Sequence, residues 1–449
     1  MDMVNGPILS KIIRFSLPLI ATGVLQLLYN AADVVVVGRF DGPQALAALG
    51  CTGSLINLII NVFMGLAIGA SVAVAQDYGA GDTKGVHKVI HTAIPLSAGC
   101  GVAVAIIGVC FSGTFLRWMG TPENVLPLAS KYLIVYFLGA PGSLIYNFGA
   151  SILRSVGDTK RPLIMLAISG IVNVVLNLVF VIVLHMGVVG VGLATIASQY
   201  LSMVMVVRYL IKVDGCCHLD LGAMKIYRDK LNRIIRVGLP AGLQGSVFSV
   251  SNVVIQSSIN SFGDLVVAGN TAAANIEGFV YVAMNSVYQA ALTFTGQNVG
   301  AKKHERIHRV VFTCAGIVCV IGLVLGVGVY LCAEPLLSIY LPDDPEAIPY
   351  GVTRLFFVSL PYMFCGLMEI FTGGQRGMGL SFTPMVTSLV GSCLFRMLWV
   401  VTVFARFGTL NSLFLVYPIS WVMTTFAHMT FYLIYKHKHF PNPPKTLTE

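Results

Sequence analysis

Long apolar runs are the feature that most limits how this chain can fold. Each run has about 20 residues, enough for a helix to cross the roughly 30 Å of hydrocarbon in a bilayer. Only 10% of the residues are charged, whereas an ordinary globular domain carries about 25%. The sequence therefore predicts an all-α polytopic membrane protein with almost no soluble portion.

Twelve apolar segments follow one another along the 449 residues, at about 12–37, 50–76, 89–111, 131–153, 163–184, 188–211, 234–259, 266–297, 309–332, 350–372, 383–405 and 410–435. The longest polar stretch, from Lys212 to Arg233, falls between the sixth and the seventh segment. We therefore expect an N-terminal lobe at 1–211, an inter-lobe linker at 212–233, a C-terminal lobe at 234–435 and a tail at 436–449.

Basic residues are distributed unevenly between the two sides of the predicted membrane. One side receives about four times as many as the other, which holds only Arg39, Arg117, Lys131, Arg354 and Arg406. Because Lys and Arg collect on the cytoplasmic side, we expect both termini and the linker in the cytoplasm. The net charge of +9 then needs no nucleic-acid partner, and the lipid bilayer is the expected surrounding.

Sequence signals for catalysis or metal binding are weak. Most of the ten cysteines lie in apolar segments, and the Cys216-Cys217-His218 cluster has no second ligand pair at zinc spacing. The chain has no G-x-S-x-G motif and no Gly-Lys dipeptide of the kind that a P-loop requires. We therefore expect neither an enzyme nor an ATP-driven pump, and no metal or cofactor apart from a coupling ion.

The two halves of the chain repeat each other in parallel orientation. The run Ile12 to Pro18 is echoed by Ile234 to Pro240, and Arg154-Ser155-Val156-Gly157 by Arg376-Gly377-Met378-Gly379. The offset between matching landmarks stays at 221 or 222 residues. Duplicated six-helix bundles that share a cleft can expose it to either side in turn, so this architecture indicates a transporter. Channels and membrane enzymes built from duplicated bundles are the alternative.

Several short motifs resemble those of the multidrug and toxic compound extrusion (MATE) family. They are Leu17-Pro18, the stretch Asp33 to Arg39, Gln76 to Gly81, Leu153 to Thr159 with its echo Gln375 to Gly379, and Gly187 to Thr195. The resemblance covers essentially the whole chain and is greatest to the bacterial DinF and MepA type of branch. It implies a monomeric antiporter in the bacterial cytoplasmic membrane that exports small organic compounds, often cationic or amphipathic, in exchange for protons or sodium ions.

Asp33 is the acidic residue that most needs a functional explanation. It lies within the first segment, where an ionised side chain at the bilayer centre costs about 2.5 to 3.5 kcal/mol on insertion scales. Gln26, Tyr29 and Asn30 lie seven, four and three residues before it and share its helix face, and Asn30 is a candidate residue for substrate binding. Such a polar stripe can also be plain interhelical hydrogen bonding, but a carboxylate is costlier than that role requires.

The resemblance adds partners for this aspartate. Family members with a cation site in the first lobe combine the first-helix Asp with positions that correspond here to Gln26, Tyr29, Asn173, Asn177 and Thr195. Asn177 stands where many members have a second Asp, so the site carries one charge instead of two. A single carboxylate away from water favours its protonated form, which suits proton exchange, although the same oxygens could ligate Na⁺. We expect protons rather than sodium, and a helix kink at Pro18.

The second lobe offers a separate set of polar residues. Glu277 and Tyr281 start a stripe at four-residue steps that could receive a cationic substrate or carry a proton, or be structural. Glu369 is a further candidate for such a site, and the alternative is a buried ion pair with Arg396. Because Arg396 is the only basic residue that the sequence argument places deep in a span, a flippase for lipid-linked saccharides is the less favoured alternative function.

Overall fold

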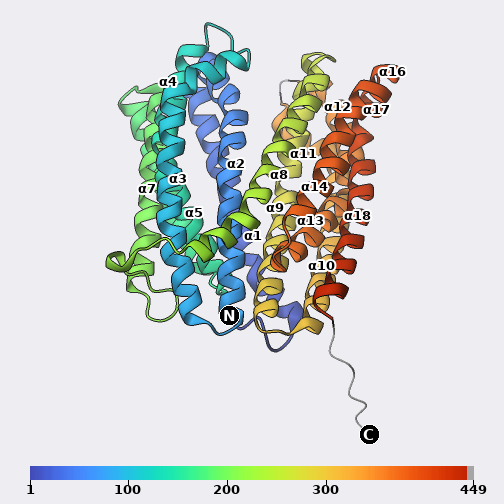
Figure 1. The fold of residues 1–449 in the computed structure, drawn as a ribbon. Helices are drawn as coiled ribbons and strands as arrows, with labels where there is room; N and C mark the ends of the chain where they lie inside the picture. The colour runs from blue at the N-terminus through green and yellow to red at the C-terminus, as the bar shows by residue number, and fades with distance from the viewer. Residues whose placement is uncertain (343, 442–449) are drawn as a thin grey trace. The chain divides into compact units, whose positions relative to one another are not determined.

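The computed structural model describes residues 1–342 and 344–441, and every regular element in these residues is a helix (Figure 1). The first half of the chain forms α1 (Ile8–Phe40), α2 (Pro43–Gly79), α3 (Thr83–Trp118), α4 (Leu126–Leu138), α5 (Ala140–Ser155), α6 (Lys160–Leu178) with η1 (Val179–Val183), α7 (Gly187–Lys212) and the short η2 (Leu221–Ala223). Residues 442–449 of the predicted tail lie outside the described part.

The second half repeats this order with more interruptions. It forms α8 (Arg228–Asn260), α9 (Asp264–Gly300), α10 (His304–Leu331), α11 (Ala333–Tyr340), η3 (Pro345–Ala347), α12 (Ile348–Ser359), α13 (Tyr362–Gly377), α14 (Phe382–Ser388), η4 (Leu389–Leu394), α15 (Phe395–Trp399), η5 (Val400–Phe404), α16 (Ala405–Phe407), α17 (Leu410–Phe414) and α18 (Val416–His439). Each of the twelve predicted segments coincides with one of these helices or with a consecutive group of them.

Most of these helices are suited to crossing a membrane. Within the described residues nine are long and apolar enough, and two bent pairs bring the total to eleven. The helix that corresponds to the seventh predicted segment, α8, is 33 residues long but carries polar side chains such as Gln244, Ser246 and Asn252. With α8 the order of elements agrees with the predicted twelve-helix architecture.

The two bent pairs are the fourth span of each half. Helices α4 and α5 meet at Gly139 with a bend of 47°, and the segment Pro345–Ser359 meets α13 with a bend of 42°. Pro141 stands in the first turn of α5, and Pro361 directly precedes α13. Because proline lacks a backbone N–H and its ring clashes with the preceding turn, a continuous straight helix is unfavourable at both places.

The chain divides into two compact units, which we call the first unit (Met1 and 21–246) and the second unit (2–20 and 247–449). Helices α1 and α8 therefore each begin in one unit and end in the other. The core of the first unit includes Ile90, Phe148 and Leu153, and that of the second includes Ile276 and Leu337. The lobe limits inferred from the sequence stay a prediction.

Helices α2 and α8 pack backbone to backbone within the first unit. Four glycines at four-residue spacing line this contact, Gly65 and Gly69 on α2 and Gly238 and Gly242 on α8. A Cβ atom added at Gly65 would lie 2.1 Å from the Gly242 nitrogen, and one added at Gly69 would lie 2.2 Å from the Ile234 carbonyl oxygen. Small residues at this spacing allow membrane helices to approach closely, so these glycines define where α8 lies on α2.

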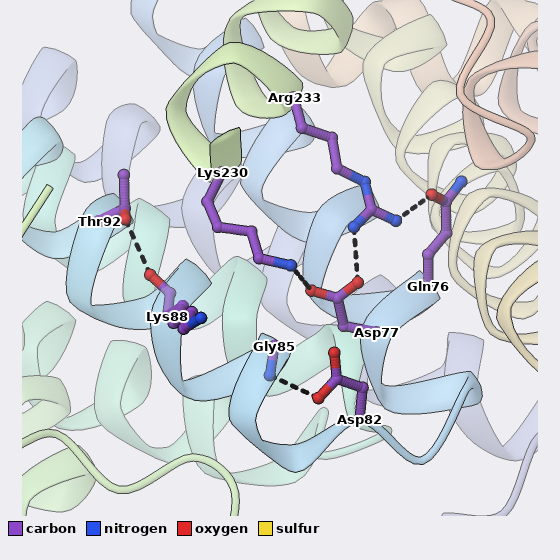
Figure 2. A network of polar contacts seen from close by, with 8 residues as sticks. All are labelled: Gln76, Asp77, Asp82, Gly85, Lys88, Thr92, Lys230 and Arg233. Atoms are coloured by element: carbon purple, nitrogen blue, oxygen red, sulfur yellow. Dashed lines mark hydrogen bonds and ion pairs between the residues drawn. The ribbon is translucent and has the colours of Figure 1, made fainter. Parts of the chain in front are cut away.

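An ion-pair network fixes the beginning of α8 to the end of α2 (Figure 2). The carboxylate of Asp77 accepts hydrogen bonds from Lys230 Nζ at 2.8 Å and from Arg233 Nη1 at 2.6 Å. Arg233 also donates to the Gln76 side chain, and Asp82 caps the first turn of α3 by accepting from the Gly85 N–H at 2.8 Å. Asp77 is therefore neutralised by two cations from a segment 153 and 156 residues further along the chain.

Candidate cation site

Helices α1 and α6 pack closely against each other one turn before Asp33 on α1. The ring of Tyr29 lies against Gly170, where an added Cβ would be 1.9 Å from the ring. The Tyr29 hydroxyl donates to the backbone carbonyl of Ala167 at 3.2 Å. Only glycine leaves room for the tyrosine at this contact, so Gly170 fixes the position of α1 on α6.

One turn further along α1, Asp33 contacts Asn177, one of two hydrogen-bonded asparagines on α6. The Asn177 amide nitrogen donates to the Asp33 carboxylate and also to the Asn173 side-chain oxygen, the latter at 3.3 Å. Asn177 is fully buried, Asn173 is buried and Asp33 is half-buried. The structure thus brings together three of the residues that the sequence argument grouped.

The other predicted members of the site do not hydrogen-bond to Asp33. Gln26 and Asn30 are exposed, and the Thr195 hydroxyl donates to the Val191 carbonyl of its own helix at 2.9 Å. Helix α1 continues through Pro18, and the kink there stays a prediction. Whether Gln26, Tyr29 and Thr195 take part in coupling is likewise untested.

Two tyrosines near Asp33 were not predicted from the sequence. The Asp33 carboxylate acts electrostatically on the hydroxyls of Tyr132 and Tyr136, and the two rings have centroids 6.0 Å apart. They lie four residues apart on α4 and therefore share one helix face. That spacing in the fourth span was a signal that could have identified them. The hydrogen-bonded part of the site is thus one carboxylate and two amides, and two phenols lie within electrostatic range of the carboxylate.

The second unit contains a buried ion pair that the sequence argument did not predict. Arg354 on α12 donates to both carboxylate oxygens of Glu277 on α9, at 2.9 and 2.8 Å, and to the Asn270 side-chain oxygen at 2.7 Å. Arg354 was expected on the non-cytoplasmic side, and that placement stays a prediction; what the sequence did not indicate is that the residue is buried, with only 9% of it exposed. Glu277 is therefore neutralised in this structure, and Arg396 is not the only buried arginine of the second unit.

Arg396, on α15, is also buried, with 3% of the residue exposed. Its Nε donates to the Ser420 hydroxyl at 3.1 Å, and its guanidinium lies 4.7 Å from the Tyr417 ring centroid and 5.9 Å from that of Trp421. No ion pair within residues 1–342 and 344–441 joins it to Glu369, so the predicted pair is not formed. Each cation–π contact stabilises the charge by about 0.5 to 2 kcal/mol.

Glu369 and Tyr281 belong to a neighbouring set of side chains in the second unit. The charged neighbour that acts on Glu369 is Arg376, whose Nη1 donates to the Tyr288 hydroxyl at 2.6 Å. The Tyr281 hydroxyl accepts from the Asn285 side chain at 3.3 Å, one turn along the predicted stripe. A role of Glu277, Tyr281 or Glu369 in substrate binding stays a prediction.

Comparison with known proteins shows which family the chain belongs to. The model of the MatE family matches residues 18–179 and again residues 240–402, which together are more than two thirds of the sequence. The chain belongs to the MatE family. The two matches also confirm the duplication, because their starts, Pro18 and Pro240, are the same landmarks that relate the two halves of the sequence.

Individual relatives of this MatE protein cover most of its length. A probable multidrug resistance protein of Bacillus subtilis, YpnP, is 27% identical over 88% of both chains. The multidrug export protein MepA of Staphylococcus aureus is 20% identical over 83% of this chain and 84% of its own. A solved outward-facing structure of a MATE family transporter is 24% identical, covers 97% of both chains and superposes with a TM-score of 0.90. The expected fold is thereby confirmed.

The MatE chain also contains an H-E-x-x-H motif that was missed in the sequence. His304, Glu305 and His308 at the start of α10 have the H-E-x-x-H spacing of zinc-dependent hydrolases. Within the described residues no group of three or more His, Cys, Asp or Glu side chains could hold a metal ion. His304 instead approaches the Pro441 carbonyl at 3.3 Å, and His308 packs on Phe312. Within the described residues the two histidines of the pattern thus have no third His, Cys, Asp or Glu ligand grouped with them.

Proposed function

We propose that this MatE protein is a cation-coupled antiporter that exports organic, often cationic, compounds across the bacterial cytoplasmic membrane by alternating access. Membership of the family, the names of its relatives and the membrane-type helices support this proposal. The single observation that carries the coupling mechanism is the half-buried carboxylate of Asp33, held by an amide of α6 inside the first unit. The protein works as a monomer with both termini in the cytoplasm.

Protons are the coupling ion that the geometry of Asp33 supports better. The side chain that faces the carboxylate is the N–H donor end of Asn177, and a donor repels a metal cation. The Asn177 side-chain oxygen is buried and has no hydrogen-bond partner in the part of the chain that the structure describes. When Asp33 takes up a proton, a turn of this amide presents that oxygen as an acceptor for the new O–H. One asparagine can therefore satisfy both charge states of Asp33.

The exchange cycle follows from these two states. The ionised Asp33 attracts a proton or an organic cation, and each neutralises the same charge, so one leaves as the other binds. Away from water, the carboxylate of Asp33 is stable only when a bound proton or organic cation neutralises it. The protein can therefore change between its inward-facing and outward-facing states only when the site is occupied. Sodium would use the oxygens of Asn173, Asn177 and Thr195, and it is the second candidate for the coupling ion.

A flux assay tests the role of Asp33. The wild-type protein in proteoliposomes should accumulate ethidium under an imposed ion gradient, and Asp33→Asn should reduce this accumulation to the level of empty vesicles. Asp264→Asn is the matched control, because Asp264 is an exposed residue in the first turn of α9. Normal ethidium transport by Asp33→Asn, with the protein present in equal amount, would remove Asp33 from the mechanism.

Separate gradients decide between the two ions. With a pH gradient alone, ethidium accumulation should be retained, and collapsing that gradient should abolish it. Transport that needs sodium and ignores the pH gradient would overturn the preference for protons while leaving the antiport proposal intact.

A further inference from the structure

We propose that Arg396 is the centre of an anion subsite in the second unit, which binds the carboxylate or phosphate group of an exported compound. The proposal rests on the proposed transport function and narrows its substrate class to compounds that carry an acidic group, including zwitterions. Nothing in the cation site of the first unit requires or forbids this second site.

Arg396 is a buried cation without a counter-ion. In residues 1–342 and 344–441 its guanidinium makes one hydrogen bond, from Nε to Ser420, and enters no ion pair. The two terminal nitrogens, Nη1 and Nη2, donate to no protein oxygen in this part of the chain. They are the two parallel donors that bind a carboxylate or a phosphate in bidentate fashion.

The surroundings of Arg396 do not supply the missing charge. Tyr417, Cys365 and Cys393 act on it electrostatically from α18, α13 and η4, and all three are neutral groups. Arg354 acts on it as a like charge, but the bidentate contact with Glu277 neutralises that residue. The charge acting on Glu369 is that of Arg376. The cluster therefore keeps one positive charge that a bound anion would balance.

The duplication gives an independent reason to regard this cluster as a binding site. At the offset of 222 residues that relates Pro162 to Pro384, Arg396 corresponds to Val174, beside Asn173 of the cation site. At the same offset Arg354 corresponds to Tyr132, which interacts with Asp33. At these two positions the second copy carries arginines where the first has uncharged residues. Because Glu277 neutralises Arg354, the unbalanced charge is that of Arg396, and an acidic ligand group suits it better than a cation.

Side chains cover the guanidinium in this structure. With 3% of Arg396 exposed, an anion that binds it must displace some of its aromatic neighbours. Trp421 is the informative one, because its ring centroid lies 5.9 Å from the guanidinium carbon and it also packs on Tyr362 and Tyr417. Occupation of the subsite should therefore change the fluorescence of Trp421.

A matched pair of probes tests the subsite in the full-length protein. Norfloxacin carries a carboxylate, and its ethyl ester does not, while both keep the basic amine. Transport of each probe and of ethidium is measured in proteoliposomes for the wild type, Arg396→Gln and the control Arg406→Gln. Arg406 is an exposed arginine at the end of the same span. Comparing each probe between variants cancels its passive leak through the lipid.

We expect Arg396→Gln to lower uptake of the acid by about tenfold or more, the loss that follows from removing charged hydrogen bonds. Uptake of the ester and of ethidium should stay within about twofold of wild type. In detergent, norfloxacin should quench the tryptophan fluorescence of the wild type but not that of Arg396→Gln or Trp421→Phe.

Two results would overturn the subsite. If Arg396→Gln lowered the uptake of the acid, the ester and ethidium equally, Arg396 would have only a structural role. If uptake of the acid were unchanged, Arg396 would bind no anion. These results differ from a failure of the transport proposal itself, in which the wild type would move none of the three probes and Asp33→Asn would have no effect to show.

Discussion

Replacing Gly65 with alanine tests whether the glycine contact between α2 and α8 is as close as the structure shows. The added Cβ would meet only backbone atoms, at 2.1 Å from the Gly242 nitrogen, 2.4 Å from its Cα and 2.5 Å from the Gly238 oxygen. Ordinary contact begins at 3.4 Å, so the two helices would have to separate locally by about 1.3 Å. No side-chain rotation can relieve this overlap, because all three atoms belong to the main chain.

The expected cost follows from two opposing effects. Overpacking a close contact destabilises by about 1 to 3 kcal/mol. Alanine in place of glycine in a helix returns about 0.8 to 1 kcal/mol. The net effect of Gly65→Ala should be a loss of about 0 to 2 kcal/mol relative to the wild type, and of about 1 to 3 kcal/mol relative to a Gly→Ala change on the same helix that meets no neighbour. Gly53→Ala, on the same helix, is the matched control, because nothing lies within 4 Å of its added Cβ.

Thermal unfolding of the detergent-solubilised protein measures this difference. The Tm of Gly65→Ala should fall below that of Gly53→Ala, whose own Tm should stay equal to that of the wild type or rise. If both variants unfolded at the wild-type temperature, the backbone contact of α2 with α8 would not exist in solution and the reasoning would be refuted.

Three further predictions concern other contacts. Asp77→Asn leaves Lys230 and Arg233 without their carboxylate, so it should destabilise the protein by about 1.5 to 3 kcal/mol, and the Tm difference from wild type should shrink at high salt. Glu277→Gln leaves Arg354 buried and unpaired, so it should cost about 3 to 5 kcal/mol, and the double change with Arg354→Met should recover much of that loss of Tm. Gly170→Ala displaces the Tyr29 ring without changing any charge, so it should reduce ethidium transport, whereas Gly99→Ala, with nothing within 4 Å of the added atom, should leave it unchanged. Wild-type ethidium transport by Gly170→Ala would contradict the contact between α1 and α6.

The sequence was sufficient for the order of the spans because that information is local. Twenty consecutive apolar residues need no distant partner to be identified as a membrane helix, and landmarks such as Pro18 and Pro240 reveal the duplication directly. The contact of Asp33 with Asn177 spans 144 residues and was expected only through the family resemblance. Neither hydropathy nor helical spacing on one helix specifies which face of another helix it meets.

Arg354 shows why the charged pairs of the second unit were missed. Its position near the beginning of a segment made a loop location reasonable, since the ends of spans are uncertain by a few residues. Its partner Glu277 lies 77 residues away, so no local pattern relates the two. Tyr132 and Tyr136 are different, because their four-residue spacing was visible and only their closeness to Asp33 needed the structure.

The division of α1 and α8 between the two compact units has a consequence for half-length fragments. A fragment that ends at residue 211 lacks residues 228–246, which belong to the first unit and supply Lys230, Arg233, Gly238 and Gly242 to it. A fragment that starts at residue 234 likewise lacks residues 2–20 of the second unit. Neither fragment would contain all the residues of its compact unit. Co-expressed fragments would have to reassociate so that each supplies the helix segment that the other lacks.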